Sequence, residues 1–77
     1  MVIQYTIQEK QKPDFNGLIL IGIQAYKENN PFGIEFIKFY ELRDYKGHTS
    51  HHFIKCIKTN DISGEIKNIL KEMGIKK

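Results

Sequence analysis

The sequence predicts an α+β domain: a four-stranded antiparallel sheet with one C-terminal helix packed on one face (ββββα). Two observations lead to this prediction. Four segments rich in β-branched and aromatic residues are separated by turn and loop residues, which is the pattern of strands. The final segment instead repeats apolar residues with the period of a helix. Residues 1–77 contain no linker and no internal repeat, so we expect a single domain.

The first two strands are expected on either side of a polar loop. Ile3, Tyr5 and Ile7 alternate with polar residues and predict the first strand. The polar stretch 9–17, which holds a proline and an Asn-Gly pair, predicts the loop. The second strand is expected over 18–26. One of its faces carries Ile19, Ile21, Ile23 and Ala25, and the other carries Leu18, Leu20, Gly22, Gln24 and Tyr26.

The third and fourth strands are expected to form a hairpin. The third strand, over 34–43, is apolar on both faces. One face carries Ile34, Phe36, Lys38, Tyr40 and Leu42, and the other carries Ile37 and Phe39 between two glutamates. Asp44 and Gly47 suit the first and fourth positions of a type I turn. The chain then returns as the fourth strand over 48–58.

The helix is predicted by an apolar stripe and by its two ends. The stripe comprises Ile62, Ile66, Ile69, Leu70 and Met73. Asn60 or Asp61 is expected to cap the free backbone amides at the start. Gly74 suits the left-handed position after the last turn, which lets Ile75 fold back on Leu70 in a Schellman motif. We expect the stripe to pack against the sheet.

The composition predicts a small cytoplasmic protein that self-associates. A chain of this length hides only about 60–65% of its unfolded surface, so its stability margin is thin. Cys56 is the only cysteine, which excludes an internal disulfide and a cysteine-based zinc site. A homo-oligomer, most simply a dimer, would supply the missing stability. The first residues lack the pattern of a signal peptide, and the apolar run 18–21 is far too short to cross a membrane, so we expect no membrane contact.

The sheet is expected to have more apolar surface than one helix can cover. A helix of about 12 residues is roughly 18 Å long and 10 Å wide, so it covers most of one face of such a sheet and none of the other. The expected core face carries Ile3, Tyr5, Ile7, Ile19, Ile21, Ile23, Ile37 and Phe39, and the opposite face carries Leu18, Leu20, Phe36, Lys38, Tyr40 and Leu42. The fourth strand adds to the opposite face either Phe53, Lys55 and Ile57 or His52, Ile54 and Cys56. An uncovered apolar face of this kind indicates an interaction site.

Two interpretations of the uncovered face compete. In the first it binds nucleic acid, because bases stack on exposed aromatic rings while lysine and arginine meet the phosphates. The residues expected to do so are Phe36, Lys38, Tyr40, Arg43, Lys46, Phe53 and Lys55. In the second the same apolar face is an interface for a protein partner, which is the function of a small inhibitor or adaptor, or for a second copy. The net charge of +3 is a mild basic bias that does not decide between them.

We therefore predict a small non-catalytic protein that binds single-stranded DNA or RNA and acts as a homodimer, with the protein-interaction module as the alternative. The order of four strands and one helix resembles that of the single-stranded DNA-binding coactivators. The resemblance lies in element order alone, and no site residue is carried over from it. It implies nucleic acid as a ligand.

No enzyme, metal or cofactor site is predicted. Three histidines, at 48, 51 and 52, lie near the single cysteine. His51 and His52 are expected on opposite faces of a strand, and His52 lies about 13 Å from Cys56 along one face, which is too far for metal binding or for activation of the thiol. Ser50 lies beside these histidines, but no orienting acid or glycine-bounded elbow accompanies it.

Overall fold

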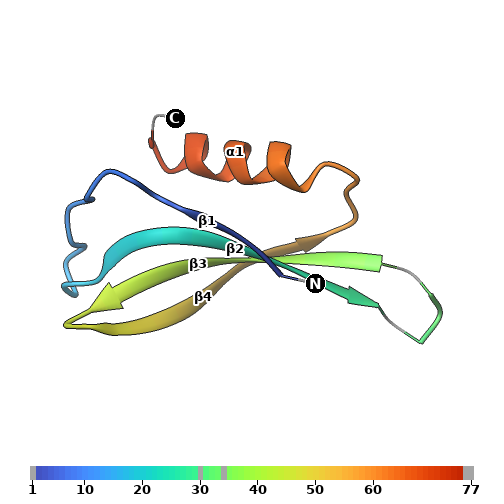
Figure 1. Ribbon diagram of the computed structural model, residues 1–77, viewed down its shortest axis with the longest axis horizontal. Helices are drawn as coiled ribbons and strands as arrows, with labels where there is room; N and C mark the ends of the chain where they lie inside the picture. Colours follow the sequence, from blue (N-terminus) through green and yellow to red (C-terminus); the bar gives the residue numbers. More distant parts are fainter. Residues whose placement is uncertain (1, 30, 34, 76–77) are drawn as a thin grey trace.

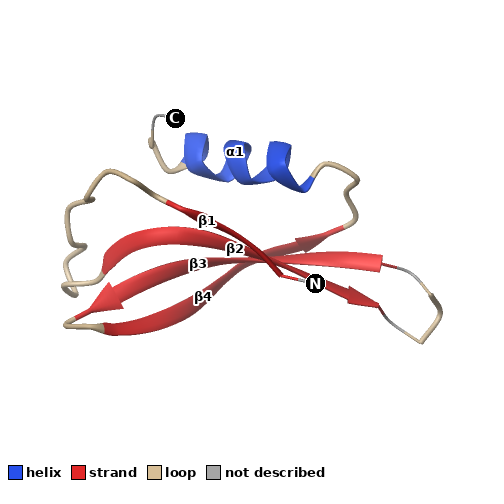
Figure 2. Ribbon diagram, in the orientation of Figure 1, coloured by secondary structure: helices blue, strands red, loops and turns tan. Residues whose placement is uncertain are grey.

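The computed structural model describes residues 2–29, 31–33 and 35–75. It contains β1 (Val2–Thr6), β2 (Ile19–Asn29), β3 (Glu35–Tyr45), β4 (His48–Ile57) and α1 (Ile62–Glu72). The strands form one sheet in the order β1-β2-β3-β4, and every neighbouring pair is antiparallel. Figures 1 and 2 show α1 lying along one side of this sheet. The predicted ββββα architecture is confirmed, while Ile34, expected in the third strand, lies outside the described residues.

The core lies between the sheet and the apolar stripe of α1. Its buried members are Ile23, Ala25, Ile37, Phe39, Ile66, Ile69 and Leu70. Ile3, Tyr5 and Ile7 pack against them from the β1 side, as the alternation of the sequence predicts. Phe39 and Ile23 have no exposed surface at all, so the middle of the sheet beneath α1 is the best-packed part of the molecule.

Both ends of α1 follow from specific residues. Of the two predicted caps, Asp61 is the one used: its Oδ1 accepts a hydrogen bond from the Gly64 amide at 2.9 Å. At the other end Gly74 has a φ of 78°, and the Ile75 amide donates to the Leu70 carbonyl at 2.9 Å. These bonds are those of a Schellman motif, so the predicted end of the helix is confirmed.

The hairpin between β3 and β4 is confirmed, but its predicted turn is wrong. Tyr45 pairs with His48, so only two residues connect the strands, and both Lys46 and Gly47 have positive φ angles of 49° and 87°. This is a type I′ turn, whose twist matches that of the flanking strands better than the predicted type I turn. As a result, β3 continues to Tyr45, two residues beyond its predicted end.

Two β-bulges change which side chains share a face: the one in β2 reverses the expected faces of Ile19 and Leu20, and the one in β4 gives neither of the two sets left open by the sequence. In β2 the register shifts between Leu20 and Gly22, so Leu20 pairs with Arg43 on the helix side and Ile19 pairs with Asp44 on the opposite side. The sequence predicted the reverse, with Ile19 on the core face and Leu20 on the opposite face. In β4 the bulge is at Ile54: Tyr40 pairs with Phe53 and the next residue of β3, Phe39, pairs with Lys55, so Ile54 is left without a pairing partner. Phe53 and Lys55, which strict alternation places on one face, therefore lie on opposite faces.

The molecule is elongated, with extents of 41 × 24 × 18 Å. The long dimension follows the strands. In Figure 1, α1 lies above the middle of the sheet, and the sheet extends beyond α1 at both ends. Among the described residues no helix is long and apolar enough to cross a membrane.

Candidate nucleic-acid interface

The side chains that point away from α1 form a surface that we call the open face. Figure 1 shows α1 on one side of the sheet and none of the described segments covering the other side. The registers place these side chains in rows across the four strands: Val2, Tyr26, Lys38 and Cys56; then Gln4, Gln24, Tyr40 and Phe53; then Thr6, Gly22, Leu42 and His51. Gly22 and Leu42 are buried, so the accessible surface lies mainly in the first two rows. Since residues directly opposite in a ladder share a face, each row is a line of neighbouring side chains.

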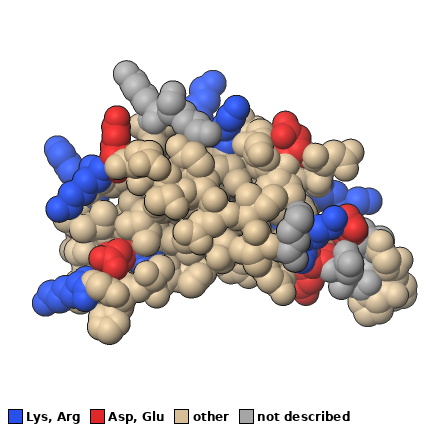
Figure 3. Space-filling model, viewed as in Figure 1, with Lys and Arg blue, Asp and Glu red and all other residues tan. Residues whose placement is uncertain are grey.

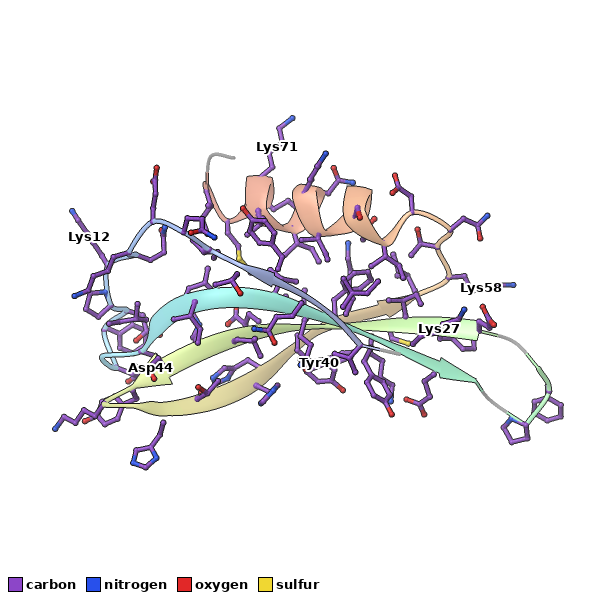
Figure 4. All side chains as sticks on the ribbon, viewed as in Figure 1. Lys12, Lys27, Tyr40, Asp44, Lys58 and Lys71 are labelled. Carbon is purple, nitrogen blue, oxygen red and sulfur yellow. The ribbon has the colours of Figure 1, made fainter. Side chains whose placement is uncertain are left out.

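Four aromatic rings lie on the open face. Phe53 and Tyr26 are 59% and 43% exposed, and Phe36 and Tyr40 are half-buried. The rings of Tyr40 and Phe53 meet edge to face, with centroids 5.7 Å apart and planes inclined by 72°. Tyr26 lies diagonally between Phe36 and Tyr40, and such diagonal neighbours are about 7–8 Å apart. In Figure 4 the side chain of Tyr40 points away from α1.

The charges on the open face nearly cancel. Lys38 Nζ lies 2.7 Å from Glu28 Oε2, and both groups are partly exposed. This contact with the Glu28 carboxylate raises the pKa of Lys38, so the ammonium stays charged but is neutralised by its neighbour. Asp44 adds a second carboxylate at the end of the face. Figure 3 shows lysine and arginine at both ends of the molecule and at its top, on the side of α1, with a largely tan area between them in that view.

Two of the residues predicted to bind nucleic acid lie on the helix side instead. Arg43 Nε is 2.8 Å from Glu41 Oε1, and Arg43 Nη1 is 3.6 Å from Asp14 Oδ2. Lys55 forms an ion pair with Glu65 of α1. A third, the turn residue Lys46, holds its Nζ 5.3 Å from the centre of the Tyr45 ring. The structure thus brings together Phe36, Lys38, Tyr40 and Phe53 and separates Arg43 and Lys55 from them.

The sequence prediction of the site missed three residues of the open face. Tyr26 lies beside Lys38, and Gln4 and Gln24 occupy the same row as Tyr40. The signal was available for the β2 members, because Gln24 and Tyr26 alternate with the buried Ile23 and Ala25. A row of aromatic and amide side chains that crosses the sheet from β1 to β4 supplies surfaces for stacking, and its amides supply both hydrogen-bond donors and acceptors.

A polar cluster occupies the helix side of the sheet near the β3–β4 turn. Ser50 Oγ lies 2.8 Å from His52 Nε2, and the Ser50 hydroxyl also lies 3.4 Å from the Arg43 carbonyl oxygen. Glu41, which pairs with His52 across the strands, accepts a hydrogen bond from Arg43 Nε. The expected separation of His51 and His52 onto opposite faces is confirmed. Within residues 2–29, 31–33 and 35–75, His, Cys, Asp and Glu side chains form no group of three suited to a metal ion.

The Asp14 carboxylate lies beside this cluster, near Arg43, and we expect it to make the stability of the protein depend on pH in the acid range. Its Oδ1 accepts hydrogen bonds from the amides of Leu18 at 3.0 Å and Asn16 at 2.8 Å, and with Arg43 nearby these lower its pKa below the ordinary 3.8. The ionised Asp14 carboxylate therefore stabilises the folded protein above about pH 4, and this stabilisation is lost as the pH falls through the pKa of Asp14 in the folded state. We expect D14N to lower the urea midpoint at pH 7 and to flatten the loss of stability below pH 4. Glu9→Gln, in the same loop, is the control that should leave the acid profile unchanged.

In comparisons with known proteins, the chain matches no family model, no curated protein and no solved structure.

Proposed function

We propose that the protein is a non-catalytic, cytoplasmic nucleic-acid-binding protein that holds single-stranded DNA or RNA on the open face and acts as a homodimer. One observation carries this proposal: four aromatic rings from neighbouring strands share an uncovered sheet face with Lys38. A sheet is a rigid support, so the rings are held at fixed positions before any ligand arrives. Such preorganisation reduces the entropy lost on binding.

The ring positions suit unpaired bases better than a duplex. A flat ring binds a base by stacking, and this requires that the base be splayed out of a helix. Stacking contributes about 1–3 kcal/mol per base and tolerates every base type. The amides of Gln4 and Gln24 lie in the row of Tyr40 and Phe53, where they could donate to or accept from the base edges. The expected ligand is therefore a short single strand lying across the face.

The ion pair between Lys38 and Glu28 gives this site a distinctive electrostatic signature. A lysine that already contacts a carboxylate gains less from a phosphate, and Glu28 itself repels the backbone of the ligand. Binding should therefore depend on stacking more than on counterion release. Replacing Glu28 by Gln keeps the side-chain shape and removes the competing charge.

The experiment is a salt titration of oligonucleotide binding. Glu28→Gln should tighten binding several-fold at low salt. Lys38→Gln should weaken binding and flatten the log–log salt slope by less than about 0.7, the value for one full phosphate contact on a single strand. Lys55→Gln removes the same charge from the opposite face and should change neither quantity. An absence of binding by the wild type at low salt would reject the proposal.

A protein partner is the second candidate, and the charge balance of the open face favours it. Lys38 is matched by Glu28, and Asp44 adds a further negative charge, whereas the apolar Val2 and Phe53 are more than half exposed. A surface of this kind fits an apolar, polar-rimmed interface such as that of an inhibitor or adaptor. If the titration shows no binding and Glu28→Gln has no effect, this candidate takes the place of the first.

A further inference from the structure

The chain exposes more surface than a compact protein of its mass. It exposes 5606 Å², whereas a globular monomer of 9.1 kDa exposes about 4,900 Å². Its radius of gyration is 13.2 Å, against about 11.5 Å for a compact domain of this length. The excess of about 700 Å² is close to the roughly 800 Å² that each partner of a stable complex buries.

The β4 edge is where a partner strand would fit. β4 ends the sheet and has 10 residues, whereas the other edge strand, β1, has 5 and lies beside α1 in Figure 1. Natural edge strands usually carry Lys or another charged residue that blocks pairing with other chains. Between the turn and the bulge, the β4 segment 48–54 contains no Lys, Arg, Asp or Glu. The segment 48–54 therefore has no such charged side chain to prevent pairing, and the one lysine of β4, Lys55, lies beyond the bulge and forms an ion pair with Glu65 of α1.

The turn determines which backbone groups face outward. A two-residue turn is closed by a pair that exchanges both backbone hydrogen bonds, and here that pair is Tyr45 and His48. Counting in steps of two along β4, the backbone groups of Ser50 and His52 also face β3. Those of Thr49, His51 and Phe53 face away from the sheet, and their side chains share the open face.

We propose that β4 pairs antiparallel with β4 of a second copy about a two-fold axis at His51. Only residues with outward backbone groups can exchange bonds, and the turn and the Ile54 bulge limit the usable segment to 49–53. The register that uses all of it sets His51 against His51 of the second copy and Thr49 against Phe53. These three pairs would exchange about six backbone hydrogen bonds. This pairing is the same when the two strands are exchanged, as a two-fold interface requires, so the expected partner of the β4 edge is a second copy of the chain and not an unrelated strand.

Such a dimer would join two open faces into one continuous surface. The two sheets would become a single sheet of eight strands, and Phe53 of each copy would lie beside the seam. The helices would remain on the other side, so the pairing would not bury the proposed ligand-binding rings. This inference rests on the homodimer of the proposed function and specifies its interface. Its tests measure self-association and not nucleic-acid binding, so the failure of one is distinguishable from the failure of the other.

The first test is the oligomeric state measured by sedimentation equilibrium. We expect the wild type to be a dimer and His51→Pro to be a folded monomer, since proline removes an outward N–H and leaves the bonds to β3 intact. Losing the two central bonds should raise the dissociation constant roughly ten- to a hundredfold. His51→Lys places like charges together at the axis and should act in the same direction, whereas His51→Val should remain dimeric. A monomeric wild type, or a dimer that survives both His51→Pro and His51→Lys, would overturn the proposal.

The second test addresses the register. In a Cys56→Ser background, His51→Cys places two thiols at the axis with Cα atoms about 5.5 Å apart. In Thr49→Cys each new cysteine lies opposite Phe53 of the second copy. It is therefore four residues along the strand from the cysteine of that copy, or about 14 Å away. The shortest bis-maleimide should therefore crosslink the first variant to a dimer and not the second. Crosslinking of Thr49→Cys alone would contradict this register, and crosslinking of neither would exclude the β4 pairing.

Discussion

Replacing Phe39 by alanine should remove a large share of the free energy of unfolding. Phe39 has no exposed surface and lies between β3 and the buried stripe of α1, so truncation leaves a cavity that the surrounding strands cannot fill. Removing a buried phenylalanine costs about 3–5 kcal/mol. A domain of this length has a total stability of only about 4–12 kcal/mol. Urea unfolding followed by circular dichroism, at one fixed protein concentration, measures the loss.

Phe15→Ala is the matched control for that experiment. The Phe15 side chain is 97% exposed in the loop between β1 and β2, so the same truncation removes no buried contact. Its effect should stay within about 0.5 kcal/mol, which is usual for a surface substitution. A loss of less than 1 kcal/mol for Phe39→Ala would place the core elsewhere.

The sequence predicted the fold because its strong signals are local. The apolar stripe of α1 and the Asp61 and Gly74 ends lie within single turns of the helix, where spacing determines the outcome. The hairpin was predicted for the same reason, from Asp44 to Gly47. Its turn type was not, because the choice between type I and type I′ depends on how far the twisted strands continue their pairing.

The candidate site was predicted only in part because bulges act beyond local alternation. Strict alternation assigns Phe53 and Lys55 to one face, and one extra residue at Ile54 moves them to opposite faces. Arg43 was included for its charge, although it alternates in phase with the buried Phe39. Charged residues on a strand find carboxylate partners such as Glu41 that only the folded chain brings close, and the sequence does not show which of them stay available to a ligand.

Leucine in place of the rings of the open face should weaken single-strand binding without unfolding the protein. Tyr26→Leu, Phe36→Leu and Tyr40→Leu each keep an apolar side chain and lose the flat surface on which a base stacks. The expected loss is about 1–3 kcal/mol per ring engaged, or roughly five- to a hundredfold in affinity. Tyr26 and Phe36 do not touch the β4 segment 49–53, so a change in oligomeric state cannot account for the result of their replacement. Tyr40 contacts Phe53, so sedimentation of Tyr40→Leu accompanies its binding measurement. Phe15→Leu, in the exposed loop, is the control.

The salt dependence of these variants separates stacking from charge. A lost ring lowers the affinity by the same factor at every salt concentration, because no phosphate contact is removed. Lys38→Gln changes the slope instead, since it removes a charge beside the rings. Tyr40 and Phe53 are in contact, so their leucine variants should be non-additive when combined, whereas Tyr26 and Phe53 should add. Binding that survives the combined loss of Tyr26, Phe36 and Tyr40 would move the ligand off the sheet, toward the lysines at the ends of the molecule in Figure 3.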